Sequence, residues 1–365
     1  MLNWVLGKKT TGARAGKTAK GRKPAYDKAR EIAASGDEEA RRALAAHEDM
    51  EPEILYFFAS DGSRLVRMVV AENPGTPLQA DVILADDDEA DVRCELARKI
   101  GRLVPQLTED ENERLIKMAL QVLEVLAHDA LPKVRAIIAE ELKHARNVPR
   151  KIIRDLAEDL DDIVSVPVLQ YSPLLSDRDL IQIIARGVKG RALIAIAARR
   201  HLAGAVVDAI VETPEADAIQ TVLENKTAAI GDGAFENIAR QAEANPEWHN
   251  AMVYRDDLPI RIIQRIASFV NAALMETLIA LNTDKKDLVE SLRKTVRERI
   301  ERGELEFEDS GHVSARERAE QEMADGTLDE KRIDAALAKE DFAFVRYGLN
   351  LLAGLVPETS AKMLN

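Results

Sequence analysis

Apolar, small and charged positions follow one short pattern that recurs along the chain. The pattern is centred on an aspartate. An apolar residue lies three positions before the aspartate and an alanine two positions before it. A valine lies five positions after the aspartate, and an arginine directly follows that valine. The three complete copies span residues 58–67, 84–93 and 126–135, and a fourth, residues 156–165, ends in Ser165 instead of arginine. The four valines are 26, 42 and 30 residues apart, which predicts an array with one helix pair per repeat.

Each position of the pattern has an expected structural role. The apolar residue, the alanine and the valine face the core, where the small alanine lets neighbouring helices approach. We expect the aspartates to cap the second helix of each pair by accepting its free N–H groups, an interaction worth ~1 kcal/mol. We expect the arginines to reach the aspartate of their own or of a neighbouring repeat and so to tie the repeats together. The predicted set is Asp61, Asp87, Asp129 and Asp159 with Arg67, Arg93 and Arg135.

The pattern fades toward the carboxyl end and divides the chain into five segments. Residues 1–24 form a basic tail, residues 25–270 the repeats and residues 271–302 a charged helix. An acidic linker at residues 303–314 leads to a helical unit at residues 315–365. That unit either covers the open apolar end of the repeats or forms a separate bundle.

These patterns resemble known families of helical repeats. The Asp and Val-Arg positions resemble HEAT repeats over residues 37–270, and residues 66–77 are similar to the leucine-rich repeat variant, an irregular helical relative. Residues 166–181, 326–329 and 342–346 resemble the bacterial family known as domain of unknown function 2336. The resemblance implies an alphaproteobacterial, cytosolic helical-repeat protein of no known activity. We therefore expect an all-α, irregular right-handed solenoid with a helical C-terminal unit.

The composition favours the same fold and an interior location. Of the 365 residues, 46% are hydrophobic, 32% charged and only 4% aromatic, which suits helices better than strands. The single cysteine, Cys94, cannot form an intramolecular disulfide, which is typical of a reducing compartment. The apolar stretches are too short to span a bilayer, and the start of the chain is unlike a secretory signal. We expect a cytoplasmic protein.

Charge is distributed unevenly between the tail and the rest of the chain. The net charge of the whole chain is −13. The tail carries seven cations and no carboxylate, a charge of +7, so the residues after the tail carry a net charge of −20. The cations are Lys8, Lys9, Arg14, Lys17, Lys20, Arg22 and Lys23. An acidic body disfavours nucleic acid, because affinity for phosphate backbones comes largely from Lys and Arg. The apolar residues Leu2, Trp4, Val5 and Leu6 precede the cations, and this order is typical of a segment that binds an anionic membrane surface.

Motifs that carry chemistry are incomplete. Residues 12–18 resemble a phosphate-binding loop but have three residues between the glycines where four are needed. Residues 86–89 are acidic but lack the glycine and glutamate of a calcium-binding loop. The six histidines are scattered, and no serine lies in a nucleophile-elbow context. We predict no catalytic residue, no cofactor and no metal site.

The function indicated by these observations is a non-enzymatic protein-binding scaffold. Tyr171, Trp248 and Tyr254 lie where the repeats are most irregular and are candidate partner contacts, because aromatics dominate interface energetics. The acidic body favours a partner with a basic or helical segment. One alternative is a peripheral membrane adaptor at the inner membrane, using the tail. Another is a base-excision enzyme on a helical-repeat scaffold, which would need a basic concave surface.

Overall fold

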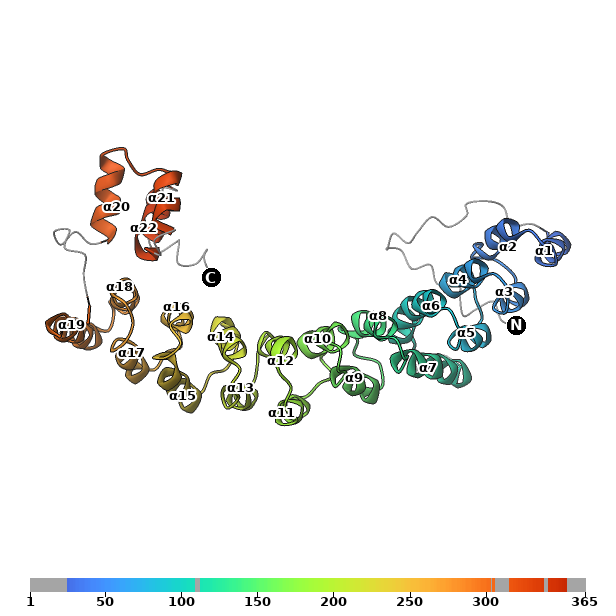
Figure 1. The fold of residues 1–365 in the computed structure, drawn as a ribbon, viewed down its shortest axis with the longest axis horizontal. Coiled ribbons are helices and arrows are strands. Elements are labelled where there is room, and N and C mark those ends of the chain that lie inside the picture. Colours follow the sequence, from blue (N-terminus) through green and yellow to red (C-terminus); the bar gives the residue numbers. More distant parts are fainter. Residues whose placement is uncertain (1–24, 109–111, 303, 306–314, 338–340, 353–365) are drawn as a thin grey trace. The chain divides into compact units, whose positions relative to one another are not determined.

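The structure, a computed structural model, describes residues 25–108, 112–302, 304–305, 315–337 and 341–352, and helices joined by turns and loops make up this part of the chain (Figure 1). The described part contains 22 α-helices, one short 3-10 helix at Val104–Gln106 and no strand, which confirms the predicted all-α class. None of its helices is both long and apolar enough to cross a membrane. The described residues divide into two compact units, the first ending at Ile210 and the second beginning at Val211. The predicted basic tail lies outside the described residues, as does most of the acidic linker.

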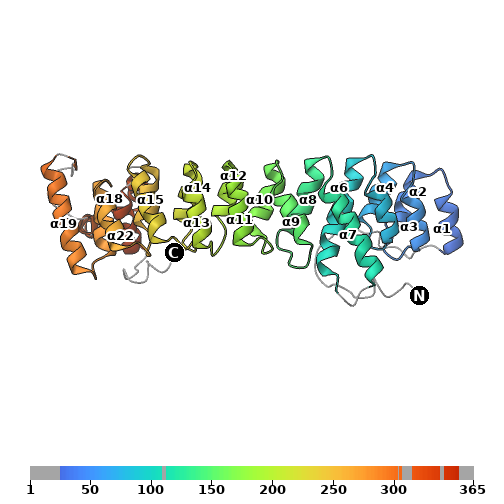
Figure 2. The same cartoon turned by 90° about the horizontal axis from the view of Figure 1, so that it is seen from below.

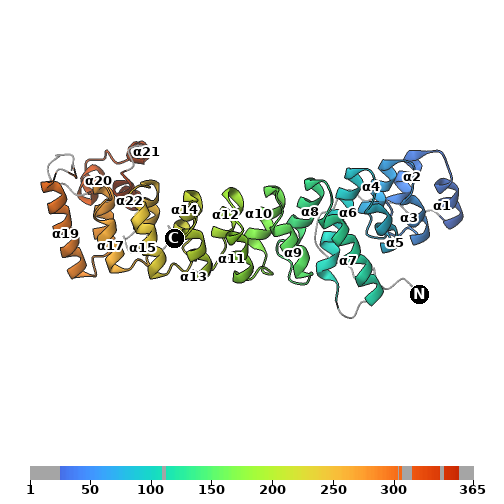
Figure 3. The same ribbon diagram turned by 60° about the horizontal axis from the view of Figure 1, so that its bottom comes forward.

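The first unit is built from helix pairs arranged in two layers (Figures 1 and 2). The first helices of the pairs are α1 (Tyr26–Ala33), α3 (Pro52–Phe58), α5 (Leu78–Leu84), α7 (Glu113–Ala127), α9 (Arg150–Ala157), α11 (Asp177–Ala185) and α13 (Gly204–Val211). The second helices are α2 (Glu38–Ala45), α4 (Arg64–Glu72), α6 (Ala90–Leu103), α8 (Pro132–Leu142), α10 (Asp162–Tyr171) and α12 (Gly190–Ala197). From α2 to α12, each second helix packs against the next one in its layer (Figure 3).

The second unit also contains stacked helices, followed by a small cluster. Two series pack along the unit: α14 (Ala216–Glu224), α16 (Glu247–Val253) and α18 (Ala272–Leu281) form one, and α15 (Asp232–Ala242), α17 (Ile260–Ile266) and α19 (Lys286–Glu301) form the other. The cluster consists of α20 (Ala315–Ala324), α21 (Glu330–Leu337) and α22 (Phe342–Leu352).

The C-terminal cluster has its own apolar core and also contacts the stacked helices. Ile333 and Phe344 belong to this core, and the guanidinium of Arg332 lies 4.4 Å from the centre of the Phe344 ring. Helix α22 packs against α18 within the same unit. The cluster therefore combines the two arrangements that the sequence left open: it has a core of its own and it covers part of α18.

The core follows the repeated sequence pattern. Val66, Val92, Val134 and Val164 are fully buried, and the alanines that precede the aspartates are at most 3% exposed. The apolar residues before those alanines are buried to the same degree. The pattern therefore marks the residues that join the two layers, and burial of these side chains is the main favourable term for packing.

Buried side chains cover the carboxyl ends of several helices, where backbone carbonyls lack partners. Asn73 Nδ2 donates to the carbonyls of Ala45 and His47 at the end of α2, at 2.6 and 2.9 Å. In the second unit, Arg255 Nη1 donates to the carbonyls of Leu223 and Asn225 at the end of α14, both at 3.0 Å. Each of these side chains follows the next helix of the same series, so it links two neighbouring helices.

Candidate interaction surface

A ladder of arginine–aspartate pairs runs along one edge of the first unit. Each arginine lies in the first turn of a second helix and forms two parallel hydrogen bonds with an aspartate of the following repeat. Arg67 Nε and Nη2 lie 2.6 and 3.0 Å from the carboxylate oxygens of Asp87. The same two-pronged contact joins Arg93 to Asp129 at 2.5 and 3.1 Å, and Arg135 to Asp159 at 2.6 and 3.0 Å.

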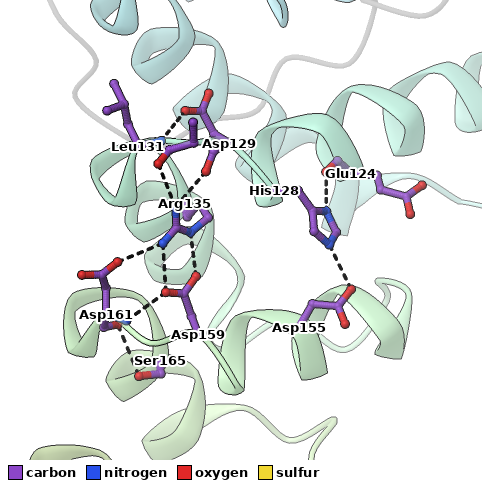
Figure 4. A network of polar contacts seen from close by, with 10 residues as sticks. Glu124, His128, Asp129, Leu131, Arg135, Asp155, Asp159, Asp161 and Ser165 are labelled. Atoms are coloured by element: carbon purple, nitrogen blue, oxygen red, sulfur yellow. Dashed lines mark hydrogen bonds and ion pairs between the residues drawn. The ribbon is translucent and has the colours of Figure 1, made fainter.

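The same arginines also contact their own repeats, so each one connects two turns. The third guanidinium nitrogen, Nη1, donates to the backbone carbonyl of the aspartate six residues earlier. Arg135 Nη1, for example, lies 2.8 Å from the Asp129 carbonyl (Figure 4). The arginine therefore binds the carbonyl of its own repeat and the carboxylate of the next.

The expectation that the aspartates cap the second helices is wrong in its detail. The N-cap residue of α4 is Ser63, and Asp61 Oδ1 accepts the Ser63 N–H at 2.8 Å instead of an N–H of the first helical turn. Asp87, Asp129 and Asp159 likewise accept the N–H two residues later, at 2.9, 2.8 and 3.0 Å. These aspartates shape the turn before the helix and hold the arginine.

The ladder begins one repeat earlier than the sequence pattern indicated. Arg41 Nε lies 2.8 Å from Asp61 Oδ2, and Arg41 Nη1 donates to the Ser35 carbonyl at 2.8 Å. The sequence carries part of the pattern at this repeat: Arg41 lies six residues after Ser35, the spacing that separates aspartate from arginine in the other repeats. Serine replaces the aspartate, so the repeat was not identified. At the other end, Ser165 Oγ bonds only the Asp161 carbonyl, at 3.3 Å, so no further pair forms from this position.

Ionisation of two ladder aspartates, Asp61 and Asp159, is stabilised in the folded chain. Burial alone raises the pKa of Asp61, but hydrogen bonds from Arg41 and from the Ser63 N–H outweigh it and lower that pKa below its ordinary value. The pKa of Asp159 is lowered in the same way by Arg135 and the Asp161 N–H, against the effect of burial. The carboxylates of Asp61 and Asp159 are therefore charged at neutral pH.

Three exposed apolar side chains lie on two adjacent turns at the ladder edge. Leu160 is fully exposed at 100%, Ile163 is 56% exposed and Leu131 is 42% exposed. Leu131 is the N-cap residue of α8, Leu160 lies in the turn before α10, and Ile163 lies in the first turn of α10. Arg135 bridges the same two turns, since it also pairs with Asp161 at 3.0 Å (Figure 4). We call Leu131, Leu160 and Ile163 the turn patch; sequence analysis missed it because isolated leucines and isoleucines are ambiguous in a helical protein.

The aromatic residues predicted as partner contacts have different surroundings. Trp248 is 1% exposed, so the prediction that it contacts a partner is wrong: it fills the core of the second unit. Tyr254 is half-buried and lines a shallow depression with Glu224, Lys226 and Glu247. Tyr171 is 46% exposed at the end of α10.

The side chains that could bind a metal ion or act as a nucleophile or base have the following surroundings. Among the described residues, no group of three or more His, Cys, Asp or Glu side chains could hold a metal ion. The Cys94 thiol is buried, and that burial raises its pKa. His128 bonds the Glu124 carbonyl at 2.8 Å and Asp155 at 3.2 Å, which links α7 to α9 (Figure 4).

A buried ion pair that sequence analysis did not predict connects α5 to α6. Asp81 is 1% exposed, and Lys99 Nζ lies 2.6 Å from its Oδ1. Burial raises the pKa of Asp81 to about 6, although the charge and hydrogen bond of Lys99 lower it in part. Lys99 also donates to the Asn73 carbonyl at 3.3 Å, so the pair helps to fix the corner after α4.

The geometry describes an all-helical protein built from stacked helix pairs that are linked along one edge by ion pairs. The chain belongs to the family described as "uncharacterised protein conserved in bacteria (DUF2336)", whose profile matches residues 164–365. This match confirms the resemblance that residues 166–181 and 326–346 carry. No curated protein matches the chain.

Proposed function

We propose that the protein is a non-enzymatic scaffold that binds another protein through the turn patch. The observation that carries the proposal is the exposure of Leu131, Leu160 and Ile163 on adjacent turns. Burial of such side chains in an interface contributes about 25 cal/mol per Å² of apolar area. The ladder holds both turns in place through Arg135, so little conformational freedom is lost on binding.

The surroundings of the turn patch favour a partner with apolar and basic residues. The carboxylates of Glu158 and Asp161 lie in the same turn as Leu160. They pair with Arg186 and Arg135, and their side chains are still 42% and 47% exposed. Such carboxylates attract a cationic partner and disfavour an acidic one. An amphipathic helix with one apolar stripe and flanking lysines or arginines matches this chemistry.

The test compares two double variants of the full chain. Leu160→Ser with Ile163→Ser removes the turn patch, and Ile83→Ser with Val125→Ser removes two exposed apolar side chains from α5 and α7 as the control. Quantitative affinity purification with each protein should show partners that the first variant loses and the control retains. An identical set of partners for both variants and the parent would contradict the proposal.

A second candidate function is peripheral attachment to an anionic membrane, favoured by the apolar-then-basic order of residues 1–24. Each cation near an anionic surface contributes about 1 kcal/mol, an attraction that salt weakens. The full chain should sediment with phosphatidylserine-containing vesicles at low salt and dissociate as ionic strength rises. Deletion of residues 1–24 should abolish sedimentation without changing the melting temperature, and equal sedimentation of both proteins would exclude this function.

A further inference from the structure

The ends of α8 and α10 opposite the ladder carry a second, chemically different surface. Helix α8 ends at Leu142 and α10 at Tyr171, and the loops that follow lead into α9 and α11. Arg150, at the start of α9, joins the two loops by donating Nη2 to the Leu174 carbonyl at 2.9 Å. We call Lys143, His144, Arg146, Arg150, Tyr171 and Arg178 the Tyr171 edge.

Tyr171 is held against α8 with much of its ring accessible. The His144 ring lies 5.2 Å from the tyrosine ring, and Lys143 Nζ lies 5.2 Å from the ring centre. The tyrosine is nevertheless 46% exposed. An aromatic ring that is supported by its neighbours and still exposed is the type of side chain that anchors interfaces.

Cations at the Tyr171 edge outnumber the nearby carboxylates, although Lys143 pairs with Glu140 and Asp177 precedes Arg178 in the chain. Arg150 and Arg154 share one carboxylate, that of Asp179, at 3.5 and 2.6 Å. Asp179 is 5% exposed and also accepts hydrogen bonds from the Ser176 N–H and hydroxyl, whereas the two arginine side chains remain 55% and 51% exposed. These arginines therefore keep hydrogen-bond donors available at the surface.

Two further arginines at this edge are exposed and lie on the two loops or just after them. Arg146 is in the loop after α8, and Arg178 is in the first turn of α11. Neither forms an ion pair with another described residue. The edge thus presents cations beside an aromatic ring, in a chain whose residues after the tail carry a net charge of −20.

We propose that the Tyr171 edge binds an acidic peptide segment of a partner protein. Carboxylates of the segment pair with Arg146, Arg150 and Arg178, and an apolar side chain of the segment packs on Tyr171. A peptide fits better than nucleic acid, because affinity for nucleic acid grows with the number of phosphates that a basic surface neutralises, and this edge covers only two loops. This site lies at the other end of α8 and α10 from the turn patch and selects the opposite charge.

The test measures fluorescence anisotropy of a labelled peptide of alternating glutamate and glycine with one central tryptophan, added to the full chain. We expect binding that weakens as salt is raised, and none to the same peptide with glutamine in place of glutamate. Arg146→Glu with Arg178→Glu should weaken binding by about tenfold, since each reversal removes an attraction and adds a repulsion. Tyr171→Ala should weaken it further.

The matched control is Lys189→Glu with Arg191→Glu, which changes the net charge equally at the start of α12, on the ladder side. This control should bind the glutamate peptide like the parent. Equal weakening by the two double variants, absence of binding at low salt, or preferential binding of a single-stranded DNA probe would each overturn the proposal. The turn-patch variant should still bind the peptide, so failure of one site is distinguishable from failure of the other.

Discussion

At the scale of single residues, consecutive aspartates in the sequence differ in their contacts. Residues 86–88 are three consecutive aspartates, but only Asp87 joins the ladder, through Arg67. Asp86 and Asp88 are exposed. Their side chains differ in environment because the turn before α6 points one carboxylate at the preceding repeat and the others outward.

Asp87→Ala should lower the free energy of unfolding by about 2 kcal/mol, since it removes hydrogen bonds to a charged group and leaves Arg67 without its carboxylate. Asp86→Ala is the control and should cost less than about 0.5 kcal/mol, as is usual for exposed positions. Urea denaturation of both variants measures the difference. Equal losses would show that the ladder pair does not stabilise the fold.

Lys99→Met should destabilise the protein in a pH-dependent way. The folded-state pKa of Asp81 is about 6 and its ordinary value is 3.8, so the folded chain holds its proton more tightly. The stability linked to that proton is present below pH 3.8 and is lost as pH rises through 6. Without Lys99 the pKa rises further, so the loss should be about 3–5 kcal/mol at pH 8 and smaller at pH 5.

The control for Lys99→Met is Lys133→Met, a lysine whose side chain is 65% exposed, which should cost less than about 1 kcal/mol at both pH values. Adding Asp81→Asn to Lys99→Met should remove the pH dependence that Lys99→Met introduces, because the buried acid beside Lys99 is gone. Denaturant titrations at pH 5 and pH 8 test both. A pH dependence that survives in the double variant would assign it to another group.

At the scale of elements, the connections between helices were predictable only in part. The repeated sequence pattern placed Arg67 next to a buried valine. It could not show whether the Arg67 side chain pairs with Asp61 of its own repeat or with Asp87 of the next, because both aspartates fit the pattern. Packing of neighbouring repeats decides between them. Trp248 was misjudged for a related reason: irregular spacing hid which face of α16 is buried.

The covering of helix ends was not predictable from local sequence, since Arg255 and the carbonyls it binds are about thirty residues apart. Arg255→Met should cost about 3 kcal/mol or more, because it leaves carbonyls at the end of α14 without donors. Arg261→Met, at a side chain that is 58% exposed, should cost less than about 1 kcal/mol. Chemical denaturation with hydrogen exchange should place the damage at α14 and α16; similar losses for both variants would contradict this role.

At the scale of the whole molecule, stacked repeats should respond to substitutions as a chain of neighbour contacts. Asp61 pairs with Arg41 and Asp129 with Arg93, so these links share no residue. Asp61→Ala and Asp129→Ala together should therefore cost the sum of their separate losses, within about 0.5 kcal/mol.

The contrasting pair is Arg67→Met with Asp87→Ala, which removes both ends of one link. That double variant should cost less than the sum of its single losses by about 1–2 kcal/mol. Urea denaturation of the four single and two double variants provides the comparison. Additivity in both pairs would mean that the ladder contacts are not coupled.

The spacing of the ladder links has a consequence for how such a chain can grow. Successive linked residues are 20, 20, 36 and 24 positions apart, yet the two-pronged contact is the same in each case. The long interval accommodates α6, the turn after it and α7 without disturbing the contact. The geometry of the link therefore does not depend on the number of residues between the arginine and the aspartate. Gene duplication or insertion can lengthen the array, provided that each added repeat contains its own aspartate and arginine.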